Sequence, residues 1–294
     1  MWFLSKSRRF KNVLRAPYLF SMKSRPGQSS EEISAVVLVV GNKHEDLALN
    51  AISSFRLTNP GISLTAFVHQ VSDSFDEALA ELGQCKTIPL LEAMGGLNHE
   101  LVQSDFGTAD FNRIVALKWD VILSELKRTG ATVLFFDTDV FFRKNVEDVL
   151  KKLSRKYAIG FQDEVGEGLW PVACTGFMFL TKRSIPFIKF MIRFTKANDY
   201  VSNDQILLNS VIRKEKQLTR HVYFFPPALF PTGRLWKQFL RVKSDFVLGE
   251  LEPFVFHANF VPDAASKTSL LKETGNWFHR SNAAAGHATM DPRK

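Results

Sequence analysis

Residues 133–142 read VLFFDTDVFF and place two carboxylates, Asp137 and Asp139, in otherwise apolar surroundings. In an extended chain, residues two apart point to the same side, so the two carboxylates face one place if the strand continues through them. Like charges that close repel unless a cation lies between them. Hard divalent ions such as Mg²⁺ and Mn²⁺ take oxygen ligands and are often shared with substrate phosphates. The stretch therefore favours a metal–phosphate site.

A simpler interpretation uses the residues that follow. Arg143 and Lys144 come directly after this stretch and would neutralise the two aspartates at the protein surface. The apolar residues on both sides argue against it, because an apolar strand is normally buried and buried charges need close partners.

Short apolar runs alternate with helical patterns through the body of the chain. The run at 35–40, AVVLVV, is typical of a strand buried on both faces, and the strand at 132–136 leads into the two aspartates. Alternation of this kind predicts an α/β fold with a mostly parallel sheet, in which ligands bind at the C-terminal ends of strands. Further strands are predicted at 62–68, 158–162, 174–180, 223–225 and 254–256, and helices at positions including 48–55, 75–82 and 111–128. A long loop is predicted at 90–110. Ser184 and Ser202 are predicted helix N-caps, and Asn145 with Asp148 a capping pair.

The net charge of +8 is concentrated at the start of the chain. Residues 1–30 hold seven of the 38 basic residues and none of the 30 acidic ones, so the rest is close to neutral. This distribution, without a basic patch in the body, argues against a nucleic-acid partner. Two cysteines, Cys85 and Cys174, are too few for a disulfide framework and fit either redox compartment.

Three segments follow from these patterns: a basic leader and linker at 1–30, a single domain at 31–280 and a disordered tail at 281–294. The leader has no apolar run long enough for a membrane span or a signal peptide. A solvated leader, a transit peptide and peripheral contact with a membrane surface all fit its basic, acid-free composition.

Five blocks in order give the chain its resemblance to a known family. GATVLFFDTDVFFRKN at 130–145 resembles the helix–Gly–strand–DxD block of the nucleotide-diphospho-sugar transferase family, which includes plant cell-wall xylosyl- and arabinosyltransferases. The later blocks are CTGFMFL at 174–180, SNDQILLN at 202–209, FPPALFPTG at 225–233 and HANFVPDAASK at 257–267. The resemblance implies a GT-A fold.

The resemblance also implies roles for single residues. Asp137, Asp139 and His257 would hold Mn²⁺ or Mg²⁺ against the donor diphosphate, and Asp204 and Gln205 would act at the sugar near the reacting carbon. The residues implied to bind the nucleotide sugar are Gly41, Asn42, Lys118, Asp137, Thr138, Thr175, Gly176 and Lys267.

Several of these residues also have an ordinary structural interpretation. A histidine beside an aromatic strand is often a packed core residue, and a helical lysine such as Lys118 or Lys267 is often a solvated or snorkelling side chain. A Gly-Asn pair such as Gly41-Asn42 often forms an ordinary turn, and a glycine within a strand, such as Gly176, often marks a bulge. Asp204 at a helix N-terminus fits a partner of the helix dipole.

Three departures from the family pattern bear on donor specificity. Cys174 stands where the family usually has Asn, Arg143-Lys144-Asn145 replaces an acidic-Pro ending, and Pro262-Asp263 replaces an expected Gly.

The sequence therefore predicts a metal-dependent glycosyltransferase that uses a nucleotide-diphosphate sugar, with UDP expected, and a glycan or glycoprotein acceptor. The resemblance implies that the transfer retains the anomeric configuration. Two other hypotheses stay open: a haloacid-dehalogenase-like phosphatase with Asp137 as nucleophile, and a non-catalytic binding module with a basic tail. The phosphatase pattern has Thr or Val where this chain has Phe141. Family members generally work in the Golgi; a cytoplasmic or peripheral-membrane location is equally compatible with the leader.

Overall fold

The computed structural model describes residues 32–83, 85–93, 108–164, 170–198, 200–215, 217–235, 253–261 and 263–278. The predicted leader at 1–30, the tail at 281–294, most of the loop predicted at 90–110, and Pro262 lie outside these residues. The predicted domain boundaries therefore stay predictions.

A seven-stranded sheet forms the centre of the described chain, in the order β3-β2-β1-β4-β7-β6-β8. Four of its neighbouring pairs are parallel, and β7 is antiparallel to both of its neighbours. The predicted α/β fold with a mostly parallel sheet is confirmed. The strands are β1 (Ile33–Val40), β2 (Ser63–His69), β3 (Cys85–Pro89), β4 (Thr132–Phe136), β6 (Ile159–Asp163), β7 (Ala173–Leu180) and β8 (Val222–Phe225).

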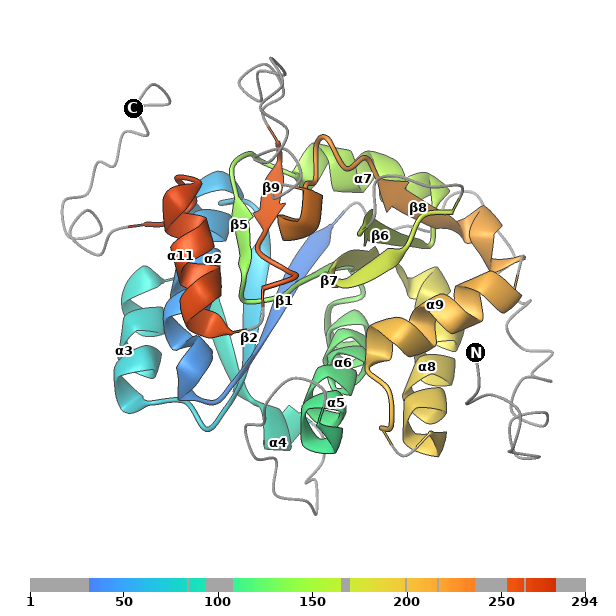
Figure 1. Ribbon diagram of the computed structural model, residues 1–294, viewed down its shortest axis with the longest axis horizontal. Helices are drawn as coiled ribbons and strands as arrows, with labels where there is room; N and C mark the ends of the chain where they lie inside the picture. The colour runs from blue at the N-terminus through green and yellow to red at the C-terminus, as the bar shows by residue number, and fades with distance from the viewer. Residues whose placement is uncertain are drawn as a thin grey trace.

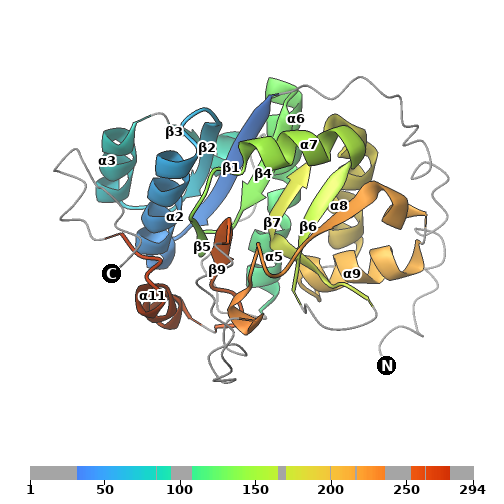
Figure 2. The same ribbon diagram turned by 90° about the horizontal axis from the view of Figure 1, so that it is seen from above.

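Helices cover both faces of this sheet (Figures 1 and 2). One face packs against α4 (Leu90–Ala93), α6 (Lys118–Thr129), α8 (Ile185–Ala197) and α9 (Asp204–Lys214). The other packs against α2 (Glu45–Thr58), α3 (Asp73–Leu82) and α7 (Glu147–Lys156). Every residue of β4 and β7 is buried, as expected for strands in the middle of a three-layer structure.

A second, two-stranded antiparallel sheet lies beside the first and consists of β5 (Val140–Phe142) and β9 (Val255–His257). A small apolar cluster joins it to α11 (Ala264–Glu273) through residues such as Phe141, Phe256 and Leu271. Figure 1 shows β5, β9 and α11 on the same side of the molecule as α2. This small sheet brings residues near 140 together with residues near 257.

Short helical segments complete the described chain: α5 (Ala109–Ala116), η2 (Asn42–His44), η3 (Lys182–Ser184) and η4 (Leu218–His221). Within the described ranges, no helix has both the length and the apolar character needed to cross a membrane.

The structure corrects some helix predictions. The helix predicted at 111–128 is divided at Leu117, which ends α5 and precedes α6. The N-cap of α9 is Asn203, not Ser202, because the Asn203 side chain accepts a hydrogen bond from the Ile206 amide.

The side chains of Ser184 and Asn145 do not make the helix-capping hydrogen bonds that were predicted. Ser184 precedes α8, but its hydroxyl donates to the Thr181 carbonyl and makes no cap hydrogen bond. Asn145 accepts from the Glu147 amide while Val146 takes the N-cap position of α7.

Candidate functional site

The two aspartates of VLFFDTDVFF lie in a turn and not in a continuous strand. β4 ends at Phe136 and β5 begins at Val140, so Asp137 and Asp139 are held by the turn between the two sheets. Backbone hydrogen bonds fix this turn: the Asp137 amide donates to the Gly176 carbonyl, and the Ala258 amide donates to the Asp139 carbonyl. The strand therefore does not continue through both aspartates, which was the condition for strand alternation to align the two carboxylates.

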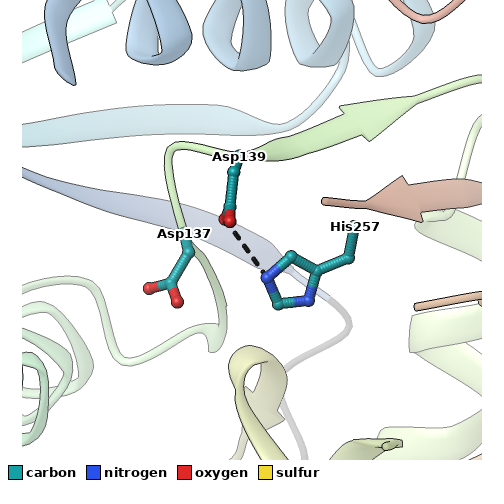
Figure 3. A group of neighbouring side chains, drawn as sticks. All are labelled: Asp137, Asp139 and His257. Carbon is teal, nitrogen blue, oxygen red and sulfur yellow. Dashed lines mark ion pairs between the residues drawn. The ribbon is translucent and has the colours of Figure 1, made fainter. Parts of the chain in front are cut away.

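The two aspartates nevertheless converge with His257, at the end of β9 (Figure 3). One potential ligand atom from each of the three side chains lies within 4.8 Å of the others, and His257 Nε2 is 3.2 Å from Asp139 Oδ1. Two ligands on opposite sides of one Mg²⁺ lie about 4.2 Å apart, twice the usual bond length. The oxygen and nitrogen donors thus fit a divalent ion after a small contraction.

Gly176, in β7, leaves the space in which these side chains meet. A Cβ at this position would lie 2.4 Å from His257 Cε1 and 2.6 Å from Asp137 Oδ2. The pairing of β6 with β7 is also irregular near this glycine, as the bulge interpretation predicted. Gly176 thus lies close to the side chains of His257 and Asp137. An approach of its backbone to a sugar stays a prediction.

Lys267, in the first half of α11, completes the charge balance around Asp139. Its Nζ lies 2.7 Å from Asp139 Oδ2. Burial alone would raise the pKa of Asp139, but the charges of Lys267 and His257 outweigh it and hold that pKa well below its usual range. Burial also opposes the charged form of His257 and would lower its pKa, but the neighbouring Asp139 raises that pKa to about 10. Without a metal, His257 and Lys267 together supply the positive charge that the buried carboxylate needs.

Lys118 joins the other aspartate to a second buried carboxylate. Its Nζ lies 3.7 Å from Asp137 Oδ1 and 3.3 Å from Asp204 Oδ2, and it donates to Thr175 Oγ1 at 3.1 Å. Burial opposes the charged form, yet the two carboxylates raise the pKa of Lys118 and keep it cationic. For Asp204, burial outweighs the neighbouring lysine and raises the pKa. Lys118 is therefore a buried member of the cluster and not a snorkelling side chain.

Gln205, beside Asp204 at the start of α9, is held at both ends of its amide. Its Oε1 accepts from the Thr175 amide at 3.3 Å, and its Nε2 donates to Glu164 Oε2 at 2.6 Å. Glu164 was not predicted, because it follows β6 without any motif. Burial raises its pKa, while Gln205 and the charges of His257 and Arg234 lower it in part.

Gly41, Asn42 and Thr138 follow the C-terminal ends of two strands, β1 and β4. Gly41 follows β1 with a positive φ of 73°, and its amide donates to the His69 carbonyl at 2.9 Å. Asn42 is exposed, and Thr138 lies in the turn between Asp137 and Asp139. Their contact with a nucleotide stays a prediction.

The departures from the family pattern have local structural roles. The Cys174 thiol lies 3.8 Å from His257 Nδ1 and accepts from Asn259 Nδ2 at 3.7 Å, so it contacts the candidate metal ligand His257 on its Nδ1 side. Asp263 caps α11 through the Ser266 amide. Arg143 donates to Asn276 Oδ1 and to the Thr274 carbonyl.

The two aspartates form ion pairs with residues far away in the sequence. Asp137 pairs with Lys118, and Asp139 pairs with His257 and Lys267.

Comparison with known families agrees with this geometry. Residues 74–271, about two thirds of the chain, match the nucleotide-diphospho-sugar transferase family. The chain belongs to this family. It is therefore a glycosyltransferase, and of the three hypotheses drawn from the sequence, the family match supports this one. The matched segment contains Asp137, Asp139, His257 and Lys267, whereas Gly41 and Asn42 precede it.

Solved structures show the same fold at low sequence identity. An active-site mutant of LgtC has a TM-score of 0.53 and 14% identity, with 81% of this chain and 95% of that chain covered. The bifunctional glycosyltransferase WbbM has a TM-score of 0.55 and 12% identity, with 90% and 53% covered. GlyE of Streptococcus pneumoniae has a TM-score of 0.52 and 14% identity, with 86% and 62% covered. The GT-A fold predicted from the sequence is thus confirmed. No curated protein sequence gives a significant match.

Proposed function

We propose that this nucleotide-diphospho-sugar transferase uses a divalent metal, Mn²⁺ or Mg²⁺, and a UDP-linked sugar, and that it transfers the sugar to a glycan or glycoprotein with retention of configuration. The observation that carries the proposal is the convergence of Asp137, Asp139 and His257 from segments some 120 residues apart. An imidazole nitrogen beside two carboxylates favours Mn²⁺ somewhat over Mg²⁺.

Asp137, Asp139 and His257 would hold the metal, which when bound stabilises negative charge on the leaving diphosphate. In the metal-free state, the protonated Nε2 of His257 pairs with Asp139 Oδ1 at 3.2 Å. Because Nε2 would have to be a neutral imidazole nitrogen to hold a cation, His257 would give up this proton when it serves as a ligand. Lys267 keeps its charge and stays beside Asp139, where it adds a second positive group near the diphosphate.

Lys118, Thr175, Asp204 and Gln205 would form the sugar side of the site. Asp204 Oδ2 is buried and faces the Lys118 ammonium at 3.3 Å, which is its ion-pair partner. A carboxylate oxygen has a second lone pair, so it is suited to accept a further bond from a sugar hydroxyl. Gln205, fixed by Thr175 and Glu164, would face the reacting carbon, where it orients the sugar.

The proposal is tested by metal-dependent hydrolysis of a panel of nucleotide sugars, followed by donor binding measured calorimetrically. We expect turnover of one UDP-sugar with Mn²⁺ and none after chelation. Asp139→Asn should lose metal-dependent donor binding, whereas Asp76→Asn, an exposed acid on α3, should behave like the wild type. A folded protein that neither binds nor hydrolyses any donor with metal present would overturn the proposal.

A further inference from the structure

Gln162 contacts His257 from behind, although no sequence motif marks it. This glutamine lies in β6 and is fully buried, and its Oε1 is 2.7 Å from His257 Nδ1. Its Nε2 donates to the carbonyls of Phe230 at 2.9 Å and Pro231 at 3.1 Å. Because a carbonyl only accepts, the NH₂ end of the amide must face Phe230 and Pro231, and the oxygen must face His257.

This orientation decides which nitrogen of His257 carries the hydrogen. The Gln162 oxygen only accepts, so Nδ1 must donate to it. A neutral imidazole that keeps its hydrogen on Nδ1 has its lone pair on Nε2. Nε2 is the atom that faces Asp139 at 3.2 Å, so the lone pair points into the cluster of candidate metal ligands.

The segment 230–231 binds both the side chain of Gln162 and the main chain of His257. The His257 amide donates to the Pro231 carbonyl at 3.2 Å, and the neighbouring Gly233 amide donates to Asn259 Oδ1 at 2.9 Å. Gln162 therefore sets the ring against the backbone that already holds the His257 main chain. The Cys174 thiol, 3.8 Å from Nδ1, is a weak partner that does not replace the amide oxygen.

We propose that Gln162 is a positioning residue for the metal site, which holds His257 in the Nδ1–H tautomer and in the ring orientation that Nε2 needs to bind a divalent ion. The inference rests on the proposed metal function and extends it to a residue outside the family motifs. Partners of this kind behind a metal-bound histidine typically change metal affinity about 10–100-fold when they are removed.

The test compares Gln162→Leu and Gln162→Glu with the wild type by Mn²⁺ titration, with free Mn²⁺ followed by electron paramagnetic resonance. Leu removes the acceptor and the donor, so we expect Mn²⁺ affinity to fall about 10–100-fold. Glu keeps an acceptor for Nδ1 and, when protonated on its other oxygen, one donor for the Phe230 or the Pro231 carbonyl, so its affinity should stay near that of the wild type. Because the imidazole favours Mn²⁺, Gln162→Leu should also narrow the preference for Mn²⁺ over Mg²⁺.

A double-mutant cycle shows whether Gln162 acts through His257. In a His257→Ala background, Gln162→Leu should cause no further loss of Mn²⁺ affinity. Asn59→Leu is the matched control, because Asn59 is an equally buried amide that accepts from Val146 in a different part of the fold. It should lose stability and keep Mn²⁺ affinity.

The outcomes separate the two proposals. A wild-type protein that does not bind Mn²⁺ would show that the metal site itself is wrong. Wild-type binding with unchanged affinity in Gln162→Leu, or an equal loss with His257 absent, would overturn the role of Gln162. If Gln162→Leu does not fold, Gln162→Glu decides: a folded Glu variant with near wild-type affinity supports the proposal, and one with strongly reduced affinity overturns it.

Discussion

Replacing Gly176 by alanine tests how tightly the candidate site is packed. The new Cβ would lie 2.4 Å from His257 Cε1, whereas carbon atoms in contact are normally about 3.5–4.0 Å apart. Since Gln162 and Asp139 hold the His257 ring from both sides, the ring has little room to move. Overpacking of this kind costs about 1–3 kcal/mol of unfolding free energy, which corresponds to a fall in Tm of roughly 2–12 °C.

The matched control is Gly160→Ala in β6, whose Cβ would lie 2.1 Å from Phe179 Cε1, among core residues. Both variants should lose stability in urea unfolding, but only Gly176→Ala should displace His257 and lower Mn²⁺ affinity by about tenfold or more. Equal Mn²⁺ affinity in the two variants would refute the reasoning, because it would mean that the space at Gly176 has no bearing on the site.

Three further predictions concern charge. Lys118→Met should lower the unfolding free energy by about 3–5 kcal/mol, since it leaves the buried Asp204 carboxylate without its ammonium partner. Urea unfolding should show much of this loss restored when Asp204→Asn is added, and no restoration would contradict the ion pair. Lys267→Met should weaken donor binding, because it removes a positive charge from the proposed diphosphate site, while the protein still binds Mn²⁺. Calorimetry measures both affinities, and an unchanged donor affinity would show that Lys267 does not contact the diphosphate. Folding raises the pKa of His257 from 6.5 to about 10, so the stability that protonated His257 contributes is complete below pH 6.5 and is lost as the pH rises through about 10. The Tm of the metal-free protein should therefore fall between these pH values, and the fall should be smaller in His257→Asn.

Strands with continuous apolar runs were predicted well from the sequence. β1 and β7 are buried along nearly their whole length, so their composition reflects their position directly. β3 was missed because it reads Cys-Lys-Thr-Ile-Pro and lies at the edge of the sheet, where Lys86 and Thr87 are exposed. An edge strand with one sheet neighbour does not need the apolar pattern that marks a central one.

The candidate metal ligands were predicted from motifs, and the structure brings all three together. Their supporting partners were not predictable in the same way. Gln162 looks like the polar end of a strand, and its significance depends on His257, which lies 95 residues away. Glu164 likewise has no local pattern, because its contact with Gln205 depends on how β6 and α9 pack.

The position of β9 and α11 at the end of the described chain has a consequence for synthesis. The last strand of the main sheet ends at Phe225, whereas His257 and Lys267 come later in the sequence. Proteins emerge from the ribosome from the N-terminus, and folding begins before the chain is complete. A nascent chain can therefore assemble its main sheet some 30 residues before it can offer the complete set of proposed metal ligands. Ribosome-bound chains of increasing length should accordingly become protease-resistant before they bind Mn²⁺.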